Sequence, residues 1–229
     1  MAKYAIMALI GLISGFAGAA LFSVSGLGHA QTRDYLVANP EILPQMVGAY
    51  EADLASQRLK AVAGDVNRPF AEAILGNPEG SKVLVKFTDY ACGYCRTSVA
   101  DIDRLIAANP DLKVVVREWP IFEGSEAAAR MGLAAAKQGK YDAFYHAMFQ
   151  MGPPTAQSIA AAAQAAGIDV EAARTYGASD EVTTELARTD AMARQLGFTG
   201  TPSWVMGDEV FEGAIGFDRL ASLVAEAGG

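Results

Sequence analysis

The sequence predicts an α/β protein in which a small sheet carries an inserted helical subdomain and follows a separate helical arm. Three observations predict this class. An apolar, β-branched run at 82–88 ends just before a Cys-x-x-Cys, residues 125–197 are alanine-rich with helical spacing, and a strand hairpin and a closing helix follow. With 229 residues, 52% of them hydrophobic, the chain is long enough for one large domain with an appendage.

Residues 1–30 are predicted to be a secretory signal peptide or a membrane anchor. Lys3 is charged, but no charged residue occurs from Tyr4 to Val24. Small residues before Gln31 suit signal peptidase, whereas the apolar run is also near the lower length limit of a spanning helix, so both interpretations stay open. Either way the body is expected in a periplasmic or other extracytoplasmic compartment, where thiols are oxidised, and an uncleaved anchor would tether it there.

Residues 31–68 are predicted to form a helical arm and a linker. Asn39, Pro40 and Glu41 suit the cap and first turn of a helix that continues to about Val62, and 63–69 have linker composition. The helix carries an apolar stripe at helical spacing: Ile42, Leu43, Met46, Val47, Tyr50 and Leu54. This stripe packs either on its own domain or, through residues 39–62, on the arms of other protomers.

Residues 69–229 are predicted to form the main domain, with glycines and prolines separating its elements. The expected strands are 73–75, 82–88, 112–119, 200–206 and 209–213; the expected helices are 96–108, 125–137, 141–151, 155–166, 169–176, 179–196 and 217–227. The strand–helix–strand unit should be right-handed with parallel strands. A helical insertion at about 123–197, followed by a hairpin and a helix, indicates a thioredoxin-like sheet with an inserted subdomain.

Cys92 is expected where a strand ends and a helix begins. The free N–H groups and the positive dipole end of a helix N-terminus both stabilise an anion. A cysteine in such a motif has a pKa of roughly 3.5 to 7.5, against about 8.5 for a free thiol. Cys92 is therefore the expected exposed, attacking sulfur, and Cys95, one turn inside, the thiol that resolves the mixed disulfide.

Other uses of the cysteine pair are less favoured. The chain has two cysteines and two histidines, His29 and His146, too few nearby ligands for a structural zinc site. A structural disulfide that closes so small a ring would restrain little unfolded-state entropy. No metal and no cofactor is therefore predicted. The net charge of −8, without a basic cluster, argues against nucleic acid as a partner.

Three segments carry a family resemblance: Phe87–Cys95, Arg117–Ile121 and Thr201-Pro202. Together they resemble the DsbA-type thiol–disulfide oxidoreductases, over about residues 70–229. The segment 35–43 further resembles the N-terminal region of the suppressor-of-copper-sensitivity (ScsC-like) branch. In some members of that branch, this region mediates oligomerisation.

The resemblance implies a role for each matching residue. Cys92 would be the nucleophile and Cys95 the resolving thiol. Pro202 would be a cis-proline facing the disulfide, and the backbone of Thr201 would hold a substrate strand. The dipeptide between the cysteines, Gly93–Tyr94, replaces the Pro-His of strongly oxidising members, which predicts a milder oxidant.

Lys86 departs from the resemblance, because relatives commonly carry a buried acid six residues before the first cysteine. Lys86 either extends its amine to the surface from a half-exposed strand or is partly buried with a lowered pKa and accepts the proton of Cys95. Glu118 is another candidate acid without a predicted place. The aromatic residues near the motif are either core residues or an apolar rim that binds unfolded polypeptide, with Tyr94 as the substrate-contacting residue: Tyr90, Tyr94, Trp119, Phe122 and Trp204.

The predicted function is disulfide exchange in exported substrate proteins. Isomerase or reductase activity is favoured, because an oligomer formed by the arm would place several active sites on one substrate. A membrane redox partner would reset the cysteine pair. One alternative is a DsbA-like dithiol oxidase. An alternative from another class is a Cu(I)-handling protein with a role in copper tolerance, because soft thiolates suit that ion.

Overall fold

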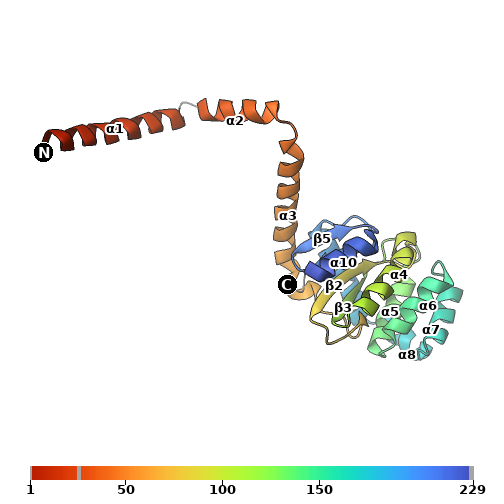
Figure 1. The fold of residues 1–229 in the computed structure, drawn as a ribbon. Helices are drawn as coiled ribbons and strands as arrows, with labels where there is room; N and C mark the ends of the chain where they lie inside the picture. The colour runs from red at the N-terminus through yellow and green to blue at the C-terminus, as the bar shows by residue number, and fades with distance from the viewer. Residues whose placement is uncertain (1, 25–26, 227–229) are drawn as a thin grey trace. The chain divides into compact units, whose positions relative to one another are not determined.

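The computed structural model describes residues 2–24 and 27–226, and the chain divides into two units, residues 1–52 and 53–229 (Figure 1). Residues 1, 25 and 26 of the predicted leader and Ala227 of the predicted last helix lie outside the described residues. The first unit contains α1 (Ala2–Val24), α2 (Leu27–Ala38) and the start of α3 (Ile42–Val66). Among the described residues, no helix has both the length and the apolar character needed to cross a membrane.

The start of α3 differs from the prediction. Asn39 does not cap this helix; its side-chain amide donates to the Tyr35 carbonyl of α2 over 2.7 Å. The backbone N–H of Asn39 donates to the same carbonyl over 3.0 Å, so Asn39 closes the last turn of α2. Pro40 cannot continue the helix because it has no N–H to donate. The helix α3 begins at Ile42 and runs to Val66, so the first half of the predicted linker is helical.

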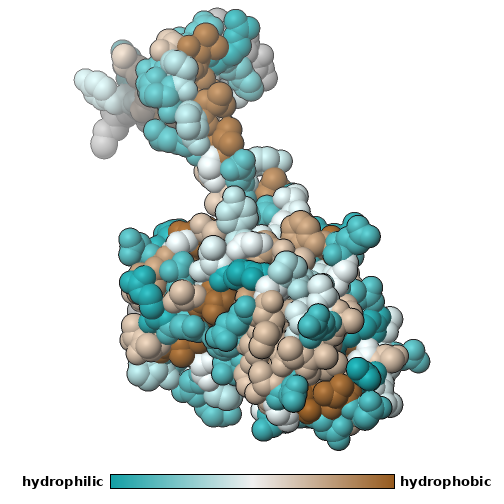
Figure 2. Space-filling view, turned by 90° about the vertical axis from the view of Figure 1, so that its right-hand side faces the viewer, coloured by the Kyte–Doolittle hydropathy of each residue, from teal (hydrophilic) through white to brown (hydrophobic). Residues whose placement is uncertain are grey.

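The two parts of α3 have different surroundings. In the second part Leu59, Val62 and Val66 are buried in the core of the second unit, as expected for an arm that packs on its own domain. In the first part the apolar side chains are 43% to 64% exposed: Leu43, Met46, Val47 and Tyr50. Figure 2 shows hydrophobic side chains among hydrophilic ones on the surface of the N-terminal unit. Four residues of the predicted stripe are thus exposed, whereas Ile42 and Leu54 are half-buried.

The second unit is built on a five-stranded sheet with the order β1-β3-β2-β4-β5. Its strands are β1 (Ile74–Gly76), β2 (Lys82–Thr88), β3 (Leu112–Glu118), β4 (Ser203–Met206) and β5 (Glu209–Glu212). The central pair β2–β3 is parallel and the other pairs are antiparallel. The predicted parallel pair of the strand–helix–strand unit is confirmed.

Seven helices complete this unit within the described residues (Figure 1). They are α4 (Gly93–Ala108), α5 (Glu126–Lys137), α6 (Tyr141–Met151), α7 (Ala156–Ala165), α8 (Val170–Gly177), α9 (Asp180–Leu196) and α10 (Gly216–Glu226). Thr155, Asp169 and Ser179 accept bonds from the first turns of α7, α8 and α9, which is why each helix begins one residue after the predicted start. The thioredoxin-like fold with a helical insertion is as predicted.

Helices cover both faces of the sheet. Leu84 and Val116 pack in one hydrophobic cluster with residues of α4 and α10, whereas Val85, Phe87 and Val115 pack in another with residues of α9 and the end of α3. Every residue of β2 from 84 to 88 is therefore buried. Within residues 84–88 the central strand has no solvent-facing side from which a long polar side chain could reach water.

Arg117 fixes the end of α3 to the sheet. Its guanidinium is buried and forms an ion pair with Glu185 of α9 over 2.7 Å. It also donates to the carbonyls of Asp65, Val66 and Arg68. Because a buried guanidinium binds three carbonyls at the end of α3 and just beyond it, the last turn of α3 is an integral part of the domain rather than a detachable linker.

Candidate active site

Cys92 occupies the N-cap position of α4, where the strand-to-helix pattern placed it. Its sulfur accepts the N–H of Cys95 over 3.3 Å. The predicted exposure of Cys92 is wrong, because the residue is only 4% exposed and Cys95 is fully buried. Cys92 nevertheless lines a surface cavity of about 500 Å³, formed with Ala91, Gly93, Tyr94, Thr97 and Phe122.

The two sulfurs have opposite electrostatics. Hydrogen bonding from the Cys95 thiol is the largest influence on Cys92. Together with the polar side chain of Thr201 and the backbone N–H groups of the helix, it outweighs burial and lowers the pKa of Cys92 to about 5. Burial, followed by that same bond, raises the pKa of Cys95 well above the ordinary range of a thiol. At neutral pH, Cys92 is therefore a thiolate and Cys95 a thiol.

Thr201 and Pro202 lie directly against the cysteine pair. The peptide bond between them is cis, as the resemblance implies. Ser203 pairs with Phe87 across β4 and β2, which brings the preceding residues beside the end of β2. The Thr201 carbonyl lies 3.1 Å from the Cys92 sulfur and accepts its S–H when that sulfur is protonated.

Lys86 is fully buried, so the interpretation that it extends to the surface is wrong. Its amine donates to the hydroxyls of Tyr145 over 2.5 Å and Ser98 over 2.9 Å, and to the Cys95 carbonyl over 3.5 Å. It also lies over the rings of Tyr145, Phe149 and Trp204. Burial lowers its pKa to about 8, although the nearby cysteines partly oppose this shift.

Glu118, whose place the sequence did not predict, belongs to the same buried environment. It pairs with Thr88 across β2 and β3, and its Oε1 accepts the hydroxyls of Tyr90 and Tyr141 over 2.8 and 2.7 Å. Gly132 permits this approach of α5, because a Cβ there would stand 2.9 Å from Oε1. Burial raises the pKa of Glu118 to about 8, against the lowering effect of the two tyrosines.

The aromatic residues divide between core and rim. Tyr90, Trp119 and Trp204 are buried, whereas Tyr94 is 69% and Phe122 48% exposed beside the Cys92 cavity. Asp89, which the sequence did not single out, holds the Phe122 loop: its Oδ2 accepts the N–H groups of residues 121 and 122 and the Ser125 hydroxyl. The signal available in the sequence was an acidic residue three positions before the first cysteine.

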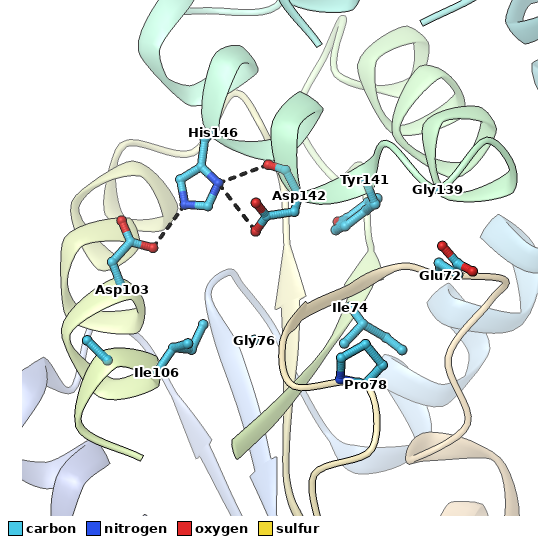
Figure 3. Close-up of a pocket in the computed structure, with 11 residues that line it drawn as sticks. Glu72, Ile74, Gly76, Pro78, Asp103, Ile106, Gly139, Tyr141, Asp142 and His146 are labelled. Atoms are coloured by element: carbon cyan, nitrogen blue, oxygen red, sulfur yellow. Dashed lines mark hydrogen bonds and ion pairs between the residues drawn. The ribbon is translucent and has the colours of Figure 1, made fainter. Parts of the chain in front are cut away.

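A second, larger pocket of about 720 Å³ lies between α4, α6 and the segment around β1 and contains neither cysteine (Figure 3). In it, His146 of α6 lies between Asp103 and Asp142, with Nε2 2.9 Å from Asp103 of α4. Burial alone lowers the pKa of His146, but the bonds to both aspartates outweigh it and raise the pKa above its ordinary value. His146 thus ties the cysteine-bearing helix to α6.

We expect this tie to be pH-dependent. Because the folded pKa of His146 is raised, its contribution is complete below the unfolded pKa of about 6.5 and disappears as the pH rises through the folded value. His146→Ala should cost on the order of 1 kcal/mol of unfolding free energy at about pH 5.5, and clearly less near pH 8.5. Denaturant titrations at both pH values measure this. Asp103→Asn should remove the same pH-dependent part; a pH-independent cost would contradict the ion pair.

A CxxC pair at the N-terminus of a helix in a thioredoxin-like fold defines the chain as a thiol–disulfide oxidoreductase. Residues 83–225 match the model of the DSBA-like thioredoxin domain, and the chain belongs to this family. Residues 29–57 match the N-terminal domain of the copper resistance protein ScsC. Both resemblances noted in the sequence are thereby confirmed.

Solved structures agree with this assignment. A thioredoxin-like oxidoreductase from Silicibacter pomeroyi DSS-3 is 41% identical, covers 71% of this chain and 94% of its own, and has a TM-score of 0.66. A linker-deletion mutant of ScsC from Proteus mirabilis is 27% identical, covers 87% of this chain and 92% of its own, and has a TM-score of 0.69.

One curated relative is much longer. The Na(+)/H(+) antiporter NhaA of Herminiimonas arsenicoxydans is 30% identical over 132 residues, which are 54% of this chain. The match spans 21% of the antiporter, so the chain corresponds to about a fifth of that protein.

Proposed function

We propose that the chain is an exported oxidoreductase that exchanges disulfides in substrate proteins, with Cys92 as nucleophile and Cys95 as resolving thiol. The observation that carries this proposal is the asymmetry of the pair. The pKa of Cys92 is lowered to about 5, and Cys92 lines a surface cavity, whereas Cys95 is fully buried with a raised pKa. The first sulfur is suited to attack and the second to follow it.

The exchange has two steps. The Cys92 thiolate attacks a substrate disulfide, a mixed disulfide forms, and one substrate sulfur leaves as a thiolate. Cys95 then loses its proton and attacks the Cys92 sulfur, so the substrate's second sulfur leaves and the Cys92–Cys95 disulfide remains. In the reverse direction a substrate thiolate attacks Cys92 and Cys95 leaves.

Three residues support these steps. The neutral amine of Lys86 accepts the proton of Cys95, since its pKa of about 8 keeps part of it neutral near physiological pH. The backbone of Thr201, beside Pro202 and close to the Cys92 sulfur, holds an extended substrate segment. The exposed ring of Tyr94 gives that segment an apolar contact at the cavity edge.

The direction we favour is isomerisation or reduction. The exposed stripe of α3 and the match of residues 29–57 to the ScsC N-terminal domain support assembly of the arm with other copies of the chain. An oligomer would place several cysteine pairs on one misoxidised substrate. A DsbA-like dithiol oxidase, reset by a membrane redox partner, is the alternative direction.

We place this activity outside the cytosol. The segment from Tyr4 to Val24 has no charged residue and precedes small residues at 28–30, as in a leader or an anchor. A similar structure is described as a periplasmic thioredoxin-like protein from Salmonella enterica serovar Typhimurium. A cysteine pair of this kind works on disulfides where disulfides persist.

Trapping tests the proposal. With a disulfide-containing peptide, Cys95→Ser should accumulate a mixed disulfide, because the resolving thiol is gone, and Cys92→Ser should form none. The alkylation rate of Cys92 in Cys95→Ser should remain that of a thiolate at neutral pH. Mass spectrometry of quenched samples measures both. Equal trapping by the two variants, or none by either, would contradict the assigned roles.

A Cu(I)-handling function is the second candidate, and the match to the copper resistance protein ScsC is the observation that favours it. Cys92 and Cys95 would supply two soft thiolate ligands. Titration of the reduced chain with Cu(I) separates the two functions. Tight binding through both thiols without disulfide exchange would replace the oxidoreductase proposal.

A further inference from the structure

Two buried hydroxyl groups beside the cysteine pair have no hydrogen-bond partner among the described residues. They belong to Thr88, which is fully buried, and Thr201, which is 8% exposed. Most buried polar groups in proteins are paired, so each exception needs an explanation. A group that awaits a charge formed only during a reaction is one such explanation.

Thr88 faces the side of the sheet on which Cys95 lies. Side chains alternate along a strand, so Lys86 and Thr88 of β2 share one face. The Lys86 amine on that face donates to the Cys95 carbonyl and to Ser98 in the next turn of α4. Thr88 is the last residue of β2, so it lies closer in sequence than Lys86 to the first turn of α4, which contains Cys95.

The two hydroxyls act differently on the two sulfurs. The polar side chain of Thr201 favours the ionised form of both cysteines, since it lowers the pKa of each. The Thr88 side chain lowers the pKa of Cys95 and is not among the main influences on Cys92. Burial dominates at Cys95 and raises its pKa, so this thiol needs donors when it ionises.

We propose that the Thr88 hydroxyl is a catalytic group that donates to the Cys95 sulfur when this sulfur carries negative charge, with Thr201 as a second donor. The inference rests on the proposed disulfide exchange. As Cys95 attacks, its proton passes to Lys86, the Cys92–Cys95 bond forms, and the substrate sulfur leaves Cys92 with the bonding electron pair. In reverse, Cys95 leaves with that pair. Both directions develop charge on Cys95, and the Thr88 hydroxyl, which has no partner in the described part of the chain, is buried on the same face of the sheet.

Thr88→Val tests the proposal, because valine keeps the shape of threonine and lacks its hydroxyl. The measured quantity is the rate at which dithiothreitol reduces the oxidised full chain, in which Cys92 is attacked and Cys95 leaves. Samples are quenched with acid and the free thiols are labelled for mass spectrometry. Thr88→Val should be roughly 10-fold slower than wild type, the usual effect of losing one hydrogen bond to a charged group. Thr88→Ser should stay within about 3-fold, because it keeps the donor.

Two controls distinguish the loss of the Thr88 hydroxyl from a general packing effect and from a change in the reactivity of Cys92. Thr189→Val removes a hydroxyl from another buried threonine, on α9 and on the opposite face of the sheet, and should leave the rate unchanged. Alkylation of Cys92 should proceed equally fast in Cys95→Ser and in Cys95→Ser with Thr88→Val. Thermal unfolding confirms that each variant is folded.

The outcomes are distinct. A wild-type rate for Thr88→Val overturns the proposal, and so does a Thr88→Ser variant as slow as Thr88→Val, since the shape of the side chain would then matter and not its hydroxyl. Slower alkylation of Cys92 in the double variant would also overturn it. A wild-type chain that exchanges no disulfide would instead overturn the proposed function on which the inference rests.

Discussion

Deletion of residues 31–52 is expected to abolish reactivation of a disulfide-scrambled substrate and to leave oxidation of a dithiol peptide within about 2-fold of wild type. Isomerisation benefits from several active sites on one substrate, whereas oxidation of a small peptide needs a single cysteine pair. The deleted segment contains the exposed stripe Leu43, Met46, Val47 and Tyr50. An apolar stripe at helical spacing is the usual seam between helices of associated chains. Both activities and the mass in solution, by analytical ultracentrifugation, should be measured on residues 31–229 and on the deleted form.

The position of the cut decides whether this experiment can be interpreted. A deletion up to residue 62 would remove Leu59 and Val62, which are 5% and 6% exposed in the core beneath the sheet. Loss of such side chains typically costs about 2–5 kcal/mol each, enough to unfold a domain of ordinary stability. The compact second unit begins at residue 53, so a cut after residue 52 keeps this core.

A variant without a deletion is the matched control. Leu43→Glu with Val47→Glu places two charges in the stripe and leaves the chain length unchanged. It should dissociate the protein and lose reactivation like the deletion. If the deleted form keeps both its mass and its reactivation activity, the arm does not assemble the isomerase. If intact residues 31–229 are monomeric and reactivate nothing yet oxidise dithiols, the chain is a DsbA-like oxidase.

The order and the limits of the elements in the main domain were largely predictable, because glycines, prolines and capping residues mark them in the sequence. The strand Lys82–Thr88 and the helix Tyr141–Met151 have the limits that their patterns predicted. Errors arose where a side chain acts across a boundary. Asn39 has the composition of a cap for the following helix, but it bonds backwards to Tyr35. Residues 63–66 have the composition of a linker, yet they are helical, and Arg117 donates hydrogen bonds to the carbonyls of Asp65 and Val66.

The candidate site was predictable for residues whose chemistry is local and not for those that depend on the sheet. Cys92 and Cys95 follow from a motif at a strand end. The burial of Lys86 follows only when both faces of its strand are covered, a condition that the uninterrupted apolar run at 83–85 indicated. Glu118 and Thr88 become neighbours through the register of β2 and β3, which no local pattern specifies.

The second large effect is expected at Lys86, where stability and activity should change in opposite directions. A fully buried amine whose pKa falls from 10.5 to about 8 costs the fold roughly 3 kcal/mol at neutral pH. Lys86→Met removes this cost but leaves the Tyr145 hydroxyl without its partner, a loss of about 1–2 kcal/mol. The variant should therefore be more stable than wild type by on the order of 1 kcal/mol near pH 7.

The pH dependence gives the sign of this effect. Below about pH 8 the folded chain carries the buried charge and the full cost is present. As the pH rises from 8 towards 10.5, the folded and then the unfolded amine lose their protons, so the cost disappears and wild type gains stability relative to Lys86→Met. Denaturant titrations at about pH 7 and pH 10 should show the advantage of the variant shrinking between them.

The same substitution should slow the resolution of a mixed disulfide by about 100-fold, since general-base groups typically contribute 10²–10⁴-fold. Wild-type resolution should rise with pH through about pH 8, where Lys86 becomes neutral, and Lys86→Met should lack that inflection. Lys82→Met is the matched control, because Lys82 lies at the start of the same strand and its amine donates to the Val224 carbonyl, away from the cysteine pair. A resolution profile unchanged by Lys86→Met would contradict the proton relay. A variant that is more stable and slower would mean that the fold bears the buried amine for its chemistry, because burial of the charge itself opposes folding.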